Sequence, residues 1–270
     1  MNPVDVELLL DQAEDALQSE NFELTLELCQ RVMEAEPGYP GALFLVAETW
    51  RALGQMDTAE AHYRAVLAQL AGHSASWSAL GTVYFDTLRL DEAANCALRA
   101  IREDPDNSEG YYLRALLRER RGDYAGSDRD YLQASILEPD LFPLPVRLDD
   151  AAVEAVVESA LRALDPSIQD ELSMVTILLD ELPDRDICDQ FQPSSPSEIL
   201  GVFTGMPVSE RSVENPWSQL PAGIVIFRRN LERFAWDRDA LIEQLRITLF
   251  HEIGHHLGLS EEDLEDRGLD

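Results

Sequence analysis

Residues 74–107 read SASWSALGTVYFDTLRLDEAANCALRAIREDPDN, and this stretch decides the fold of the first half of the chain. Small residues such as Gly81 and Ala93 stand among larger apolar ones, and Pro105 follows the second of two apolar segments. The pattern is typical of two helices that approach closely where the small residues meet, with a proline ending the second helix because it lacks an amide hydrogen.

The same pattern returns every 34 residues. Pro37, Pro105 and Pro139 are separated by 68 and 34 residues, and Ala71 stands at the missing step. Two further sets of small or branched apolar residues keep this spacing: Ala13, Ala47, Gly81 and Ala115, and Val32, Val66, Ala100 and Ala134. One helix pair cannot bury its own apolar face, so several copies must stack.

A constant 34-residue period of helix pairs resembles the tetratricopeptide repeat. The resemblance implies four copies, at about 6–39, 40–73, 74–107 and 108–141, which form an all-α solenoid over residues 1–141. It also implies a concave groove that binds a protein partner, lined by Phe44, Glu48, Ser78, Thr82, Tyr112 and Leu116. Some members clamp a terminal carboxylate there with Lys, Arg and Asn, which are absent from these positions, so a chaperone tail is not the expected ligand.

A different pattern begins at EPDLFPLPVR (138–147), where three prolines end the solenoid. Asp149 or Asp150 can cap a helix that runs to about Leu164. MVTILLD (174–180), ILGVFTG (199–205) and GIVIFRR (223–229) predict three strands, and a helix is expected from about Asp237 to Leu257. Residues 142–270 therefore predict a small α+β domain.

Residues 251–263 read HEIGHHLGLSEED and predict a metal site. His251 and His255 are four residues apart on the expected helix, about 40° apart around its axis, so both imidazoles can reach one ion. Glu252 follows the first ligand directly. It points near the metal without being forced to bind it, which suits a general base acting on water.

A third protein ligand is expected, because catalytic zinc takes three and keeps one position for water. The spacing resembles that of the metzincins, in which a Gly seven residues after the first His lets the chain reverse and the residue at ten is the ligand. Gly258 and Glu261 stand at these two positions, so the resemblance implies Glu261. Glu262 and Asp263 remain alternatives, and Ser260 with Asp263 also has the pattern of a helix-capping pair. His256 is expected either to support the ligands or to lie at the surface.

Three segments make the second half resemble the minimal zincin-like metallopeptidases of bacteria: FTGMPVSERS (203–212), IVIFRRNLE (224–232) and HEIGHHLGLSEEDL (251–264). The resemblance covers about 145–270. It implies a Zn²⁺ site made of His251, His255 and Glu261, with Glu252 as the catalytic base for hydrolysis of peptide bonds. The strand at 223–228 is a candidate to accept substrate as an added strand, although a core strand explains the same residues.

The net charge of −31 is spread evenly over both halves. It argues against nucleic acid as a ligand and favours basic protein or peptide partners, while a solvated surface explains the same charge. The chain has no apolar run near the roughly 18 residues of a membrane span, and its acidic N-terminus lacks the order of a signal peptide, so we expect a cytoplasmic protein without membrane contact. Two functions follow: a zinc peptidase with a protein-binding repeat domain, or a repeat adaptor whose zinc-binding domain has little activity.

Overall fold

The computed structural model describes residues 3–208 and 222–265. Contacts within the chain divide it into two units, Met1–Pro143 and Leu144–Asp270. Within the described residues, no helix is both long and apolar enough to cross a membrane.

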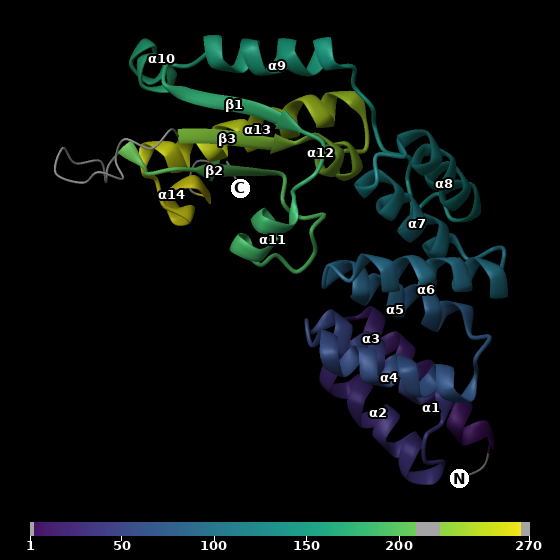
Figure 1. Ribbon diagram of the computed structural model, residues 1–270. Helices are drawn as coiled ribbons and strands as arrows, with labels where there is room; N and C mark the ends of the chain where they lie inside the picture. Colours follow the sequence, from purple (N-terminus) through teal and green to yellow (C-terminus); the bar gives the residue numbers. More distant parts are fainter. Residues whose placement is uncertain (1–2, 209–221, 266–270) are drawn as a thin grey trace. The chain divides into compact units, whose positions relative to one another are not determined.

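The first unit is an all-α solenoid of four helix pairs, as the 34-residue period predicts (Figure 1). The two helices of each pair pack against each other, and consecutive pairs stack. The pairs are α1 (Pro3–Gln18) with α2 (Phe22–Ala35), α3 (Pro40–Ala52) with α4 (Met56–Gln69), α5 (Ser74–Asp86) with α6 (Leu90–Glu103), and α7 (Ser108–Arg120) with α8 (Tyr124–Leu137).

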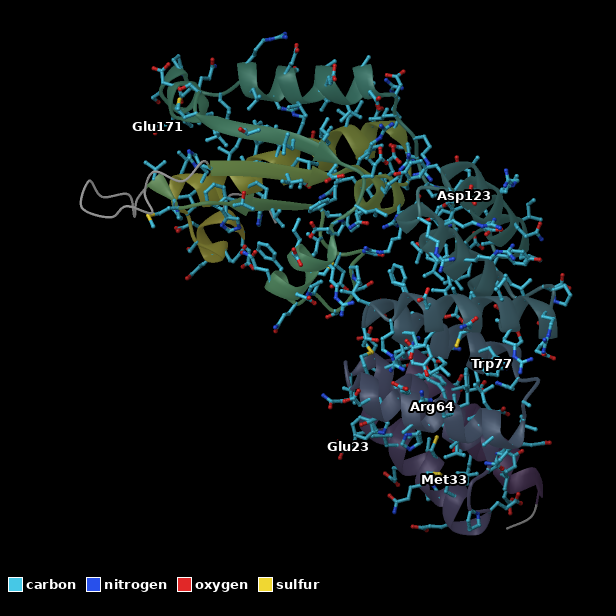
Figure 2. The ribbon with its side chains drawn as sticks, viewed as in Figure 1. Glu23, Met33, Arg64, Trp77, Asp123 and Glu171 are labelled. Carbon is cyan, nitrogen blue, oxygen red and sulfur yellow. The ribbon has the colours of Figure 1, made fainter. Side chains whose placement is uncertain are left out.

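The repeated small residues are the points of closest approach between helices. A Cβ atom added at Gly81 would lie 2.5 Å from Leu113 Cδ2 and 2.9 Å from Cys96 Cβ, so only glycine fits there without movement. Helices α2, α5, α7 and α8 begin at polar side-chain caps. The carboxylate of Asp123, labelled in Figure 2, accepts a hydrogen bond of 3.0 Å from the amide of Gly126 at the start of α8. Local sequence thus fixes both the ends of the helices and their spacing.

Two of the six residues expected in the groove are buried, and for them the prediction of an open surface is wrong. Ser78 is covered by the next repeat, because its hydroxyl donates a hydrogen bond of 2.7 Å to Glu109 on α7. Leu116 packs into the apolar core shared by the second, third and fourth repeats. The other four side chains are partly exposed, and their role in a groove stays a prediction: Phe44, Glu48, Thr82 and Tyr112.

The second unit is a three-stranded sheet with helices around it (Figure 1). The strands are β1 (Val175–Asp180), β2 (Gly201–Thr204) and β3 (Ala222–Phe227), in the order β1-β3-β2. β1 runs parallel to β3, and β2 runs antiparallel to it. The helices are α9 (Asp150–Arg162), α10 (Pro166–Leu172), α11 (Arg185–Phe191), α12 (Arg228–Phe234), α13 (Arg238–Leu257) and α14 (Glu261–Glu265).

The position of β3 corrects one prediction. Residues 223–228 were a candidate edge strand for substrate, but β3 is hydrogen-bonded on both sides and has no free edge. Its alternate residues Ile224 and Ile226 are fully buried, as in a core strand. Residues 228 and 229, expected to continue the strand, instead begin α12. Of the strands next to β3, β2 is the one that lies beside the metal motif on α13.

A buried carboxylate on α12 ties the start of the second unit to its sheet. Glu232 is 1% exposed and pairs with Arg147, Arg228 and Arg229 at 2.5, 2.8 and 3.1 Å. Its backbone carbonyl also accepts a hydrogen bond of 2.8 Å from the amide of Val146. The polar residues of the IVIFRRNLE segment therefore connect the chain around residues 146–150 to the end of β3.

Asn230 makes a second connection from the same short helix. Its side-chain amide donates to the carbonyls of Pro196 and Ile199, at 3.0 and 2.7 Å, and it is 1% exposed. These bonds fix the loop that leads into β2. The position of β2 thus depends on a residue that lies far from it in the sequence.

Replacement of Glu232 by alanine is expected to destabilise the second unit by about 3–5 kcal/mol, because three guanidinium groups lose their shared buried carboxylate. Glu243→Ala is the matched control, since that side chain is exposed and lies 3.7 Å from Arg246, and it should cost less than about 1 kcal/mol. Hydrogen exchange of peptides from β3 and α12 under increasing urea measures both values. Equal exchange in the two variants would contradict the structural role of Glu232.

Candidate metal centre

Helix α13 presents the metal motif because its opposite side is buried. The helix begins at Asp237, whose carboxylate accepts a hydrogen bond of 2.8 Å from the amide of Ala240. It packs against β2, β3 and α9. Its buried stripe consists of Leu241, Leu245, Leu249 and Ile253. With that side fixed in the core, His251 and His255 remain partly exposed on the side of a cleft.

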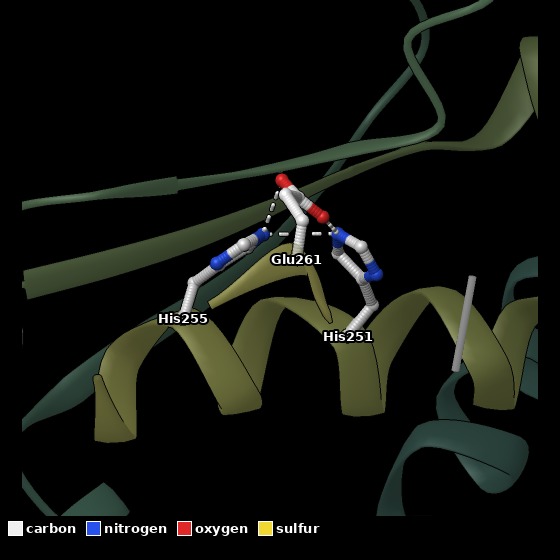
Figure 3. Close-up of side chains that lie close together, drawn as sticks. All are labelled: His251, His255 and Glu261. Carbon is white, nitrogen blue, oxygen red and sulfur yellow. Dashed lines mark hydrogen bonds and ion pairs between the residues drawn. The ribbon is translucent and has the colours of Figure 1, made fainter. Parts of the chain in front are cut away.

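Two histidines and one glutamate converge (Figure 3). The Nε2 atoms of His251 and His255 are 2.9 Å apart, and their rings are nearly perpendicular at 82°. Glu261, the first residue of α14, places one carboxylate oxygen 3.3 Å from Nε2 of His255 and the other 3.6 Å from Nε2 of His251. Two helices therefore bring three donor groups to one point.

These distances fit a zinc ion. Ligand atoms about 2.0–2.1 Å from a tetrahedral zinc lie about 3.3 Å from one another, close to the separations seen here. Two imidazoles and a carboxylate are also a donor set that zinc uses. Among residues 3–208 and 222–265, this is the group of His, Cys, Asp or Glu side chains that comes close enough to hold a metal. The assignment of the three residues as ligands stays a prediction.

The two alternative carboxylates differ from Glu261 in their surroundings. Asp263 accepts hydrogen bonds from the amide and hydroxyl of Ser260, at 3.0 and 2.7 Å, and its own amide donates to that hydroxyl at 3.2 Å. This is the capping pair that the sequence suggested, and it occupies the Asp263 carboxylate. Glu262 is exposed and lies outside the group formed by the two histidines and Glu261.

Glu252 lies beside the three converging residues but does not join them. Burial raises its pKa to about 7, the nearby charge of Glu261 adds to this rise, and a hydrogen bond from the backbone of Phe203 opposes it. A carboxyl group with a pKa near neutrality can both accept and release a proton at physiological pH. The structure thus gives Glu252 a different environment from that of the exposed Glu261.

Close packing between β2 and α13 creates that environment. A Cβ atom added at Gly201 would lie 2.8 Å from Thr248 Cγ2 and 3.2 Å from Glu252 Oε1. Sequence analysis missed Gly201, although a glycine inside a strand is a known sign of close backbone approach. The absence of a side chain at Gly201 lets the strand cover the Glu252 carboxylate.

His256 is fully buried, so the expectation that it could lie at the surface is wrong. Five residues beyond His251, it is rotated about 140° around the helix, away from the two converging imidazoles. Its ring packs against Phe203 with centroids 5.4 Å apart. This contact supports the strand whose backbone binds Glu252.

The converging residues line a cleft of about 590 Å³. Its walls include β2, the turn at Gly205 and Pro207, and Phe191 at the end of α11, three features that sequence analysis did not place at the site. Phe191 is 45% exposed, which is high for an aromatic side chain. Residues 209–212 of the FTGMPVSERS segment lie outside the described part of the chain. An open cleft with donors along one wall can admit an extended ligand.

Known protein families match residues in both units of the chain. The zincin-like metallopeptidase family matches residues 172–269. Two tetratricopeptide repeat families match residues 10–74 and 51–117. A search of curated proteins found no match.

Three of the solved structures similar to the chain each match about half of it. TTC0263, a thermophilic TPR protein of Thermus thermophilus, is 20% identical over 50% of this chain and 75% of its own, with a TM-score of 0.46. PilF of Pseudomonas aeruginosa is 17% identical over 50% and 62%, with a TM-score of 0.46. MamA from Desulfovibrio magneticus is 16% identical over 50% and 76%, with a TM-score of 0.43. By its family matches and the architecture of its two units, the chain is similar to tetratricopeptide repeat proteins over residues 10–117 and to the zincin-like metallopeptidase family over residues 172–269.

Proposed function

We propose that the protein is a zinc-dependent peptidase whose repeat unit binds a protein partner. The observation that carries the proposal is the convergence of His251, His255 and Glu261 in a cleft that also contains the buried carboxyl group of Glu252. A purely structural metal site would need no such neighbouring acid. The family match at residues 172–269 supports the same reaction class.

The chemistry follows from the positions of the residues. A zinc ion held by the three side chains would polarise the carbonyl of a peptide bond and make water more acidic. Glu252 takes a proton from the attacking water and delivers it to the nitrogen of the leaving amine.

Strand β2 is the proposed place for the peptide chain of the substrate. It pairs with β3 on one side, and Gly201, Val202 and Phe203 line the cleft that contains the two histidines. An extended peptide can add to such a strand through main-chain hydrogen bonds. This assigns to β2 the role that the sequence suggested for residues 223–228.

The metal assignment predicts one zinc ion per chain. Replacement of either His251 or His255 by alanine should abolish stoichiometric binding, because a site that loses one of three ligands holds the ion much more weakly. His62→Ala is a matched control, since His62 lies on α4 and contacts the carbonyl of Thr58 at 2.8 Å. Elemental analysis after dialysis against zinc provides the measurement. Less than one zinc per wild-type chain, or full occupancy in the His251 variant, would refute the assignment.

The catalytic assignment predicts that Glu252→Ala retains zinc but hydrolyses peptides about 10²–10⁴-fold more slowly, the usual contribution of a general base. Glu262→Ala is the control. Glu262 is exposed and follows the third ligand, so this variant should cleave peptides at the wild-type rate. Mass spectrometry of a peptide library measures the rates. A wild-type protein that is fully loaded with zinc and cleaves nothing would favour the alternative function, a repeat adaptor with a metal-stabilised but inactive domain.

The repeat unit is proposed to recruit the protein that the metal centre cleaves. The cleft is open, whereas a solenoid of four helix pairs offers a large additional binding surface. Tethering raises the local substrate concentration to the millimolar range for short linkers. The strongly acidic surface favours a basic partner.

Recruitment predicts different rates on two kinds of substrate. Residues 144–270 alone should cleave short unstructured peptides as fast as the whole chain, because both contain the same metal centre. On the natural partner, captured with the Glu252→Ala variant, the isolated unit should be much slower. Kinetics on both substrates provide the measurement, and equal rates on the partner would exclude recruitment.

A further inference from the structure

The short helix that carries Glu261 contacts α13 through a buried leucine. Leu264 lies three residues after Glu261 on α14 and is fully buried. Its side chain fills the space that Gly254 leaves on α13, since a Cβ atom at Gly254 would lie only 2.4 Å from Leu264 Cδ2. Gly254 stands between the two histidines in the sequence, so the contact lies close to the converging side chains.

The chain between the two helices is ordered by local hydrogen bonds. Gly258 has a φ of +89°, which ends α13 in a left-handed turn that glycine adopts readily. The amides of Gly258 and Leu259 return to the carbonyls of His255 and Gly254, both at 3.0 Å. Ser260 and Asp263 then cap α14. These bonds reverse the chain but do not attach α14 to the rest of the unit.

Glu261 reaches the two histidines from an exposed position on α14. Its side chain is 72% exposed, in contrast to 23% for His251 and 26% for His255. A helix of five residues is not stable in isolation. The position of the Glu261 carboxylate therefore depends on whether α14 stays docked on α13, and Leu264 is its buried anchor.

We propose that Leu264, seated against Gly254, is a positioning residue that holds Glu261 against His251 and His255 and thereby sets the metal affinity. The inference rests on the proposed metal site and extends it to residues that bind no metal themselves. Because coupling between two equilibria is reciprocal, metal binding must in turn stabilise the docked state of α14. The docked helix and the bound ion then reinforce each other.

A double-mutant cycle on zinc affinity tests the proposal. Residues that orient metal ligands typically change affinity 10–100-fold, so Leu264→Ala should weaken zinc binding about tenfold. In a Glu261→Ala background the same substitution should change affinity less than about twofold, because the carboxylate it positions is gone. Competition with a chelator measures all four proteins. Additive losses, or an unchanged affinity in Leu264→Ala, would overturn the proposal.

Two further variants separate positioning from general loss of stability. Leu172→Ala removes a buried leucine on α10, outside the two helices of the metal motif, and should leave zinc affinity unchanged. Gly254→Ala keeps Leu264 but pushes it away, so it should weaken zinc binding even if Leu264→Ala fails to fold. Wild-type affinity in Gly254→Ala would count against the proposal.

Hydrogen exchange supplies a readout independent of affinity. In the wild type, zinc should slow exchange in residues 258–265, and this protection should be lost in Leu264→Ala while β3 remains protected. A wild-type protein that binds no zinc would refute the metal site together with this inference. Zinc binding that is insensitive to both Leu264 and Gly254 would refute the inference alone.

Discussion

Burial of one side of α13 against the sheet is the constraint on which the candidate metal centre depends. Leu245, Leu249 and Ile253 are at most 3% exposed, and full burial of each such side chain contributes about 1.5–3 kcal/mol. The helical period then fixes the direction of every other residue on α13. His251 and His255 face the cleft, His256 faces the core, and Glu252 lies between these directions, beneath β2. The same packing thus separates the converging imidazoles from the buried acid.

Much of this arrangement could be predicted from sequence because it depends on local spacing. The 34-residue period predicts the helix pairs, and the four-residue interval predicts that His251 and His255 converge. The choice among three adjacent carboxylates could not be made from spacing alone. It depends on the docking of α14 and on the cap formed by Ser260 and Asp263, which are tertiary and turn contacts.

The errors share a physical cause, which is contact between distant parts of the chain. Residues 223–227 have the composition of a strand, but their central position follows from pairing with β1 and β2, and alternation along one segment does not reveal its neighbours. Ser78 occupies a position expected to be open, yet a hydrogen bond to Glu109 of the following repeat covers it. The role of Gly201 was not predicted, because it depends on the close approach of Thr248 and Glu252, which lie on α13.

The connection around Glu232 has a mechanical consequence. Tension applied along the chain from the repeat unit would reach the second unit at Val146 and Arg147, which are both bonded to Glu232. Glu232 lies on α12, directly after the central strand, so the load would pass into the middle of the sheet. Helix α13 packs against β2 and β3, so the load would reach it only through the sheet. A partner that pulls on the solenoid would therefore strain the sheet before it distorted the converging histidines.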